Sequence, residues 1–327
     1  MIPIRDTTPS KNYPIVNIGL IGLNVFIFFV QMSQGPDLER FVYIYGLVPA
    51  RYSVPQIASY FSIGQQLFSF ISFMFLHGGF WHLLSNMWSL YIFGDNVEDH
   101  MGPLQYLLFY LLSGLASGLT HLYFNYHSNM PTIGASGAIA GVMGAYFVLH
   151  PTSRILTLVP IFFIPYFIEI PAFFFLGFWF VIQFINAAGT SGGMGGIAWW
   201  AHIGGFVFGI LLLKLMDAMP VFQKISRTTL RITKKKTTHR LQMVRPVGSD
   251  KDPNLYGTIH ISWYEALTGT RKLINIPWGF QKRLFRVTVP AGVKDGSLLR
   301  LRGMGKLMSD GSRGDILLKV VIDSGFQ

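Results

Sequence analysis

The sequence predicts an α-helical membrane bundle of six transmembrane helices followed by a small all-β domain. Of its 327 residues, 51% are hydrophobic and 13% are charged, which gives more apolar surface than one soluble core needs. Residues 1–216 hold six Lys/Arg against seven Asp/Glu, whereas residues 217–327 hold twenty against eight. Because two domains in two solvents explain this contrast, we expect a membrane domain at 1–219, a basic linker at 220–254 and a β domain at 255–327.

Six stretches approach the length of about 20 largely apolar residues that a spanning helix needs. They are 15–32, 82–94 with an apolar approach from 67, 104–124, 134–150, 168–187 and 197–216. Glycines interrupt the second stretch and open the fourth, and irregular backbone occurs at membrane depth only where protein or a water-filled cavity satisfies it. No small-residue cleavage site follows a short apolar run near the amino terminus, so we expect an uncleaved first span and not a signal peptide.

Basic residues near the ends of the spans predict the orientation of the chain. Arg5 and Lys11 precede the first span, Arg154 follows the fourth, and the basic tail follows the sixth, which puts them all on one side of a six-span bundle. We therefore expect a multi-pass protein with cytoplasmic amino and carboxyl termini, and the short amino terminus suits a bacterial inner membrane. The acidic loop after the second span and the arginines of the first outer loop fit this rule less well.

Spans two, four and six all run from outside to inside in this topology, so their first residues share the outer end of the bundle. Those residues include His82, Asn86, Ser136 and His202. Polar side chains inside a bilayer are costly and usually face an interior cavity. The topology thus gathers four candidate functional residues at one depth.

Ser136 lies between glycines in Gly134-Ala135-Ser136-Gly137, where a polar turn gives way to an apolar helix. A serine at this place can simply cap the helix or help helices to pack. The glycines, however, leave room for a substrate backbone, and the positive end of the helix dipole would stabilise an alkoxide or an oxyanion. This neighbourhood favours a nucleophile.

His202 opens the sixth span, and Gly205 and Gly209 follow on its face at offsets of three and seven. That face can approach the fourth span closely. A membrane histidine is more often a helix-packing hydrogen bonder, but beside a serine at the same depth it can take the hydroxyl proton as a general base. No acidic residue is placed to orient it, so the pattern indicates a serine–histidine dyad.

His82 and Asn86 are four residues apart and share one helix face. Two hydrogen-bond donors aimed at a common point suit an oxyanion hole, and the alternative is ordinary hydrogen bonding between helices. His77, just before the span, is a weaker member of the same site.

Three motifs occur in order on spans two, four and six: HGGFWHLLSN at His77–Asn86, GASG at Gly134–Gly137, and Ala201-His202 followed by Gly205 and Gly209. This pattern resembles the rhomboid family of intramembrane serine proteases over most of residues 15–216. The resemblance implies a six-helix bundle in which Ser136 is the nucleophile and His202 is the general base.

The same resemblance implies an oxyanion site formed by His82, Asn86 and the backbone N–H of Ser136. It also implies substrates that are single-spanning membrane proteins, cut near the outer face. The first outer loop differs, because Tyr45–Arg51 stands where some relatives have a Trp-Arg pair. Five glycines between 187 and 198 predict a mobile cap, and the aromatic fifth span is either a lateral gate or a lipid-facing helix.

The composition changes sharply after Met219-Pro220. Residues 221–252 are basic and predict a linker along the anionic lipids of the inner leaflet, where each Lys or Arg contributes about 1 kcal/mol. A nucleic-acid arm is the weaker interpretation beside a membrane anchor, so we expect no nucleic-acid partner. Alternating patterns at 284–289 and 299–302, with a turn at 293–297, predict a small antiparallel β domain.

Four stretches of this domain carry recognisable sequence motifs: Ile261–Thr270, Val289–Gly296, Leu299–Gly305 and Arg313–Ile316. They resemble the carboxy-terminal substrate-binding region of DnaJ-type co-chaperones, over about 255–322. The resemblance implies a β-sandwich that binds unfolded or extended peptide, with a folded spacer or a dimer contact as the alternative. The signature of a J-domain is absent, and a chain without cysteine cannot form that family's zinc-binding module.

The leading hypothesis is therefore an intramembrane serine endopeptidase with a cytosolic peptide-binding appendage. The alternative is a catalytically silent rhomboid-like protein that binds membrane clients without cutting them, and the presence of both Ser136 and His202 argues against it. A transporter would need paired acids or internal repeats, and a metalloprotease would need an HExxH pattern or comparable ligands. The sequence predicts neither a metal nor a cofactor.

Overall fold

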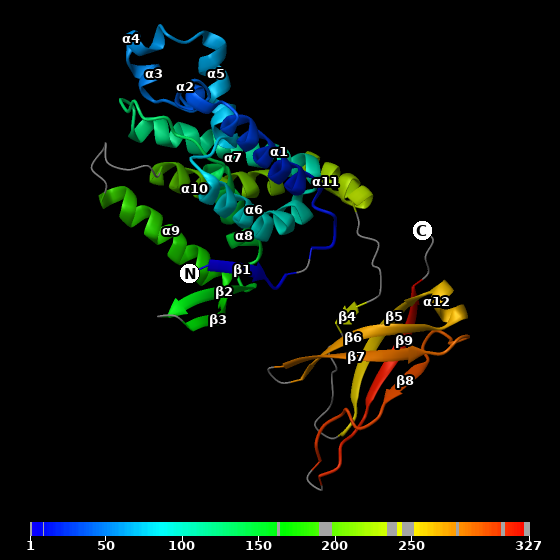
Figure 1. Cartoon of the computed structure of the whole chain (residues 1–327). Helices are drawn as coiled ribbons and strands as arrows, with labels where there is room; N and C mark the ends of the chain where they lie inside the picture. The colour runs from blue at the N-terminus through cyan, green and yellow to red at the C-terminus, as the bar shows by residue number, and fades with distance from the viewer. Residues whose placement is uncertain are drawn as a thin grey trace. The chain divides into compact units, whose positions relative to one another are not determined.

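The computed structural model describes residues 2–8, 10–161, 164–189, 198–233, 241–243, 252–278, 281–308 and 311–323 (Figure 1). The chain divides into two compact units, residues 1–235 and 236–327. The first unit is largely helical and the second is largely built from strands. The predicted fold class, a helical bundle followed by an all-β region, is confirmed.

Six helices form the body of the first unit. They are α1 (Ile15–Met32), α6 (Phe80–Met101), α7 (Pro103–Phe124), α8 (Ser136–Leu149), α9 (Ala172–Gly189) and α10 (Trp199–Ala218). Among the described residues, α1, α7, α9 and α10 are long and apolar enough to span a membrane, and α6 forms a bent span with residues 63–75, at 77°. The 14-residue α8 is a shorter apolar helix. The bend before α6 lies at His77-Gly78-Gly79, where the sequence predicts an interruption.

α8 is the most buried of these helices, and glycines bring its backbone against α10. Ten of its 14 residues are buried. A Cβ atom added at Gly205 would lie 2.0 Å from the Gly137 carbonyl oxygen, and one added at Gly209 would lie 2.3 Å from the Gly141 carbonyl oxygen. Both distances are shorter than real Cβ contacts, so only glycine lets the two helices meet here.

Replacing Gly205 by alanine should therefore destabilise the bundle. The new methyl group must push α8 and α10 apart, and overpacking a filled core costs about 1–3 kcal/mol. Gly22→Ala in α1 is the matched control, because a Cβ atom there meets nothing within 4 Å and alanine favours the helix. Thermal unfolding in detergent should give a lower melting temperature for Gly205→Ala than for Gly22→Ala. Equal melting temperatures would contradict the contact.

A small sheet joins the amino terminus to the connection between α8 and α9. β1 (Ile2–Asp6) pairs antiparallel with β2 (Arg154–Ile161), which pairs antiparallel with β3 (Ile164–Pro171). Residues 168–171, predicted to begin the fifth span, lie in β3 instead, and α9 begins at Ala172. Pro165 and Pro171 explain the difference, because proline suits edge strands and helix starts but not helix interiors.

The acidic residues after the second span belong to the end of α6, and they bind the amino-terminal segment. Glu98 accepts hydrogen bonds from the backbone N–H groups of Val16 (3.0 Å) and Asn17 (2.7 Å), which cap the start of α1. Asp99 accepts from the backbone N–H of Asn12 at 2.8 Å. A negative charge is favourable at the amino end of a helix, so Glu98 is explained by the helix end that it satisfies, and Asp99 holds the segment that leads to it.

The first outer loop folds into short helices. They are η1 (Gly35–Asp37), α2 (Leu38–Tyr45), α3 (Ala50–Ser53), α4 (Pro55–Ala58) and α5 (Ile63–Ser72), followed by the turn η2 (Phe73–Phe75). The buried guanidinium of Arg51 donates to the carbonyls of Tyr43 and Ile44 and lies 3.6 Å from the ring centre of Phe61. Arg51 thereby closes the carboxyl end of α2 and organises a loop that lacks the Trp-Arg pair.

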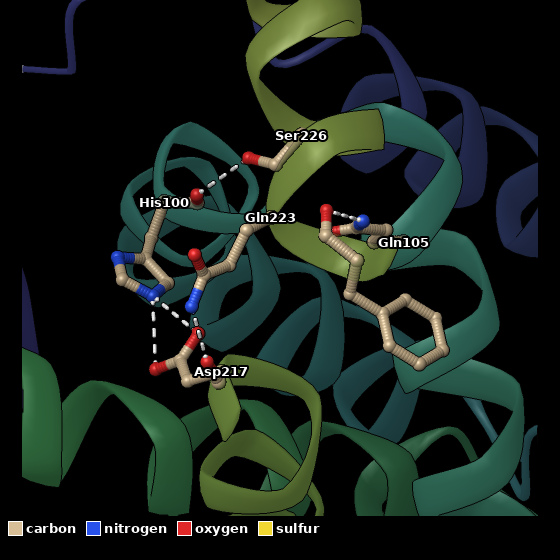
Figure 2. A network of polar contacts seen from close by, with 6 residues as sticks. His100, Gln105, Asp217, Gln223 and Ser226 are labelled. Carbon is tan, nitrogen blue, oxygen red and sulfur yellow. Dashed lines mark hydrogen bonds and ion pairs between the residues drawn. The ribbon is translucent and has the colours of Figure 1, made fainter. Parts of the chain in front are cut away.

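α11 (Pro220–Thr233) follows α10 and docks on the end of the bundle (Figure 2). The side chain of Gln105 in α7 donates to a carbonyl of α11, and Ser226 Oγ donates to the His100 carbonyl at 3.2 Å. His100 Nε2, near the end of α6, lies 3.0 Å from the Asp217 carboxylate at the end of α10. The first part of the expected linker is thus a helix held by the bundle, whereas Lys234-Lys235-Lys236 lie outside the described residues.

The second unit contains two three-stranded sheets. Its elements are β4 (Leu241–Met243), β5 (Leu255–Ser262), α12 (Trp263–Thr268), β6 (Thr270–Trp278), β7 (Gln281–Val289), β8 (Leu298–Leu301) and β9 (Ile316–Asp323). The strand orders are β4-β6-β7 and β5-β9-β8. The β6–β7 and β8–β9 pairs are antiparallel, whereas β4–β6 and β5–β9 are parallel, so the prediction of an antiparallel domain holds only for part of the pairing. Side-chain alternation has a period of two in both kinds of ladder, so it gives the buried face of a strand and not the direction of its partner.

The core of this unit comes from alternating apolar side chains. Val287 and Val289 of β7 are buried together with Ile259 and Ile261 of β5 and with Leu318 of β9. The turn predicted at 293–297 does not close a hairpin, since β7 and β8 belong to different sheets. It carries the chain from one sheet to the other.

The Arg313–Ile316 motif has a structural role in the described part of this unit. The backbone N–H of Gly303 donates to the Asp315 carboxylate at 2.7 Å, and the Arg300 guanidinium is its second partner. These two donors hold the pKa of Asp315 below its usual range. The ionised carboxylate therefore ties the loop after β8 to the start of β9.

Candidate active site

Ser136 and His202 lie side by side at one end of the bundle. Ser136 is the first residue of α8, and His202 lies in the first turn of α10. Ser136 Oγ is 2.8 Å from His202 Nε2. The two residues that the sequence puts at one depth are therefore within hydrogen-bonding distance.

The backbone before Ser136 leaves its hydroxyl available to the imidazole. Gly134 has a φ of +131°, which other residues rarely adopt, and its N–H donates to the Phe73 carbonyl at 2.9 Å. The N-cap residue of α8 is Ala135, so Ser136 is not the cap of this helix. The first N–H groups of any helix have no intrahelical partner, and Ser136 is therefore next to free backbone donors.

His82, in the first turn of α6, lies against Gly134. A Cβ atom added to Gly134 would be 2.9 Å from His82 Nε2, so only glycine leaves room for this ring. The backbone N–H of Gly78 donates to His82 Nδ1 at 3.1 Å. Because Nδ1 accepts this bond, the proton of the neutral imidazole is on Nε2, the nitrogen beside Gly134.

Asn86 lies one turn further along α6 and is buried. Its Nδ2 has no hydrogen-bond partner among the described residues. A buried donor without a partner costs about 1–3 kcal/mol. Native proteins rarely keep such a group without a reason, so Asn86 is a donor available to a ligand.

In the described part of the chain, the backbone of His77, and not its ring, is held by hydrogen bonds near the candidate site. Its fully buried ring lies 5.2 Å from the His82 ring between centroids, and neither ring nitrogen has a partner among the described residues. Gln31, near the end of α1, accepts from the His77 N–H at 3.0 Å and donates to the His77 carbonyl at 2.7 Å. Gln31 thus holds the backbone that leads to Gly78 and His82, a contact that the sequence pattern does not reveal.

A second glutamine, also missed by the sequence pattern, touches His202. His202 Nδ1 lies 2.8 Å from Gln183 Oε1 in α9, and Gln183 Nε2 donates to the Trp179 carbonyl at 3.2 Å. The rings of Trp179 and Trp199 lie 6.0 and 6.2 Å from the imidazole between centroids. The predicted serine–histidine pair therefore has a third, neutral neighbour. The available signal was an amide in a largely apolar helix at membrane depth.

The arrangement has the parts needed for acyl transfer. A hydroxyl lies beside a basic nitrogen, and donors from α6 and the start of α8 lie on the same side of the bundle. In the described ranges, no three His, Cys, Asp or Glu side chains come together as a metal site. The glycine-rich segment predicted to be a mobile cap lies outside the described residues, apart from Gly189.

The sequence matches two known domain families. Residues 64–217 match the Rhomboid domain, and residues 249–327 match the DnaJ C terminal domain. The part of the first unit that carries Ser136 and His202 is therefore similar to rhomboid domains. Both family resemblances found in the sequence are thereby confirmed, with the second match slightly longer than the predicted 255–322.

Three relatives share the rhomboid region. Rhomboid protein 1, mitochondrial, of Saccharomyces cerevisiae is 31% identical over 196 residues, which are 59% of this chain and 50% of that protein. RHOMBOID-like protein 6, mitochondrial, of Arabidopsis thaliana is 34% identical over 152 residues, or 46% of this chain and 43% of that protein. Presenilin-associated rhomboid-like protein, mitochondrial, of Bos taurus is 29% identical over 197 residues, or 59% and 46%. The chain spans half the length of these relatives or less.

Proposed function

We propose that this rhomboid-like domain is an intramembrane serine endopeptidase. The observation that carries the proposal is the 2.8 Å distance between Ser136 Oγ and His202 Nε2. Ser136 is the nucleophile and His202 is the general base, because a hydroxyl becomes a useful nucleophile when its proton is taken during attack. A transporter or a passive scaffold has no need of a serine hydroxyl held on an imidazole.

The reaction follows from this geometry in two steps. His202 Nε2 takes the hydroxyl proton as Ser136 Oγ attacks the peptide carbonyl carbon, and the imidazolium then gives that proton to the leaving amine. Water, deprotonated by the same nitrogen, then attacks the acyl-enzyme carbonyl, and the imidazolium returns this proton to Ser136 Oγ as the carboxyl product leaves. His82 Nε2–H, Asn86 Nδ2–H and the backbone N–H of Ser136 stabilise the oxyanion, and such a donor contributes about 10²–10³ in kcat.

The proposed substrates are single-spanning membrane proteins that are cut near the outer face. Spans two, four and six carry the site at their first residues, and the basic residues at 5, 11 and 154 assign the opposite end to the cytoplasm. Substrate approaches from the lipid, past the aromatic surface of α9. We place the protein in a bacterial inner membrane with both termini in the cytoplasm.

The rival function is a catalytically silent rhomboid-like protein that binds membrane clients. A fluorophosphonate probe separates the two, because it bonds covalently only to an activated serine. The purified wild type in detergent should be labelled, Ser136→Ala should not be labelled at all, and His202→Ala should be labelled at least about 10³-fold more slowly. Ser89→Ala, which removes an exposed hydroxyl of α6, is the matched control and should label like the wild type. Labelling that survives Ser136→Ala would remove the proposed nucleophile.

The carboxyl-terminal unit is proposed to bind unfolded cytosolic segments of the same membrane clients. Its support is the DnaJ C terminal domain match and the exposed apolar side chains of α12, which are Trp263, Tyr264 and Leu267. The segment 220–254, with nine Lys/Arg against two Asp, lies along anionic lipids of the inner leaflet. An appendage of this kind selects substrates and does not take part in the chemistry.

A chain ending at residue 233 tests this second part. Cleavage of a substrate with an unfolded cytosolic segment should fall several-fold relative to the full chain, whereas a substrate without that segment should be cut equally well by both. The measurement is kcat/KM for the two substrates in vesicles of the same lipid composition. Equal cleavage of both substrates by both chains would contradict a selecting role and leave the protease proposal intact.

A further inference from the structure

Gln183 is the polar side chain of α9 that meets the candidate base. The residue is buried, with 4% of its surface exposed, in a helix in which most side chains are aromatic or aliphatic. Its Oε1 lies 2.8 Å from His202 Nδ1, and its Nε2 donates to the Trp179 carbonyl at 3.2 Å. Because the amide nitrogen is committed to a carbonyl one turn earlier, the amide oxygen must be the atom that faces the imidazole.

The orientation of this amide decides which nitrogen of His202 carries the proton. An amide oxygen only accepts, so Nδ1 must donate to it and is the protonated nitrogen. Nε2 then has a free lone pair, directed at Ser136 Oγ, 2.8 Å away. This is the tautomer that a general base needs, and the opposite tautomer would present an N–H to the serine hydroxyl.

The hydrogen bond between Gln183 and His202 also links the candidate base to α9. Around it, α9 meets α10 through aromatic rings, with Phe180 4.8 Å and Trp179 6.1 Å from Phe206 between centroids. Such contacts are tolerant of small shifts, whereas a hydrogen bond is directional. The Gln183–His202 bond therefore holds the imidazole at a defined angle to α8 only while α9 lies against α10.

We propose that Gln183 is a positioning residue for His202, and that it fixes the tautomer and the orientation of the base from α9. This inference rests on the proposed function, since a base needs a reaction to serve. A neutral amide orients the ring without adding a negative charge, which suits a site inside a membrane, where a buried carboxylate is costly. The serine–histidine pair predicted from the sequence is thus a triad in geometry, with glutamine as its third member.

Two substitutions test the proposal. Gln183→Leu removes the acceptor and keeps the volume, and it should lower kcat by about 10- to 100-fold with KM nearly unchanged, less than the ~10⁴-fold loss from disturbing a triad carboxylate. Gln183→Glu keeps an acceptor and adds a negative charge that stabilises the imidazolium. This variant should retain activity at high pH. The acid limb of its kcat/KM profile should move to higher pH, because His202 stays protonated, and so cannot act as a base, up to a higher pH.

Gln34→Leu is the matched control, since Gln34 is partly exposed and its side chain bonds only the Val30 carbonyl among the contacts of the described chain. It should leave kcat and the pH profile unchanged. Thermal unfolding of each variant in detergent checks that it is folded, and the shifted pH profile of Gln183→Glu is a readout that a purely structural role would not move. A Gln183→Leu variant that cleaves at the wild-type rate, or a Gln183→Glu profile that overlies the wild type, would overturn the role of Gln183. A wild type that neither labels nor cleaves would instead overturn the proposed function itself.

Discussion

The backbones of α8 and α10 touch where Gly137 and Gly141 face Gly205 and Gly209, and this contact sets the distance between Ser136 and His202. A Cβ atom at Gly205 or Gly209 would lie 2.0 or 2.3 Å from an α8 carbonyl oxygen, so a side chain there must push the two helices apart and strain the Ser136–His202 hydrogen bond. The constraint is steric and local, yet it decides the chemistry, because a hydroxyl that does not meet the imidazole is an ordinary buried alcohol. Helices in lipid associate mainly by such packing, since no hydrophobic force drives them together.

Several polar side chains of this bundle hold the fold by pairing with backbone groups. Glu98 satisfies the start of α1, Arg51 satisfies the end of α2, and Gln31 satisfies both backbone groups of His77. Asn86 Nδ2 is one of several buried polar atoms that have no partner among the described residues, together with both ring nitrogens of His77. An oxyanion role for Asn86 is supported by its place, because its unused donor lies one turn along α6 from His82, whose ring lies against Gly134.

Much of this organisation could be predicted from the sequence, because its signals are local. Apolar length gives the spans, and glycine spacing gives the face that joins α10 to α8. Gln183 could not be placed in the same way, since α9 is apolar all round and has no stripe that shows which side meets the bundle. The β1–β2 pairing joins residues about 150 positions apart, and the parallel β5–β9 pair spans almost the whole second unit. Local pattern carries no information on such long-range partners.

The structure of the chain after reaction with a fluorophosphonate tests the account most directly, because the adduct resembles the tetrahedral intermediate. The account predicts phosphorus bonded to Ser136 Oγ, with the phosphonyl oxygen within hydrogen-bonding distance of His82 Nε2, Asn86 Nδ2 and the backbone N–H of Ser136. It also predicts that Gln183 keeps its contact with His202 Nδ1. An adduct on another residue, or a phosphonyl oxygen turned away from α6, would contradict the account.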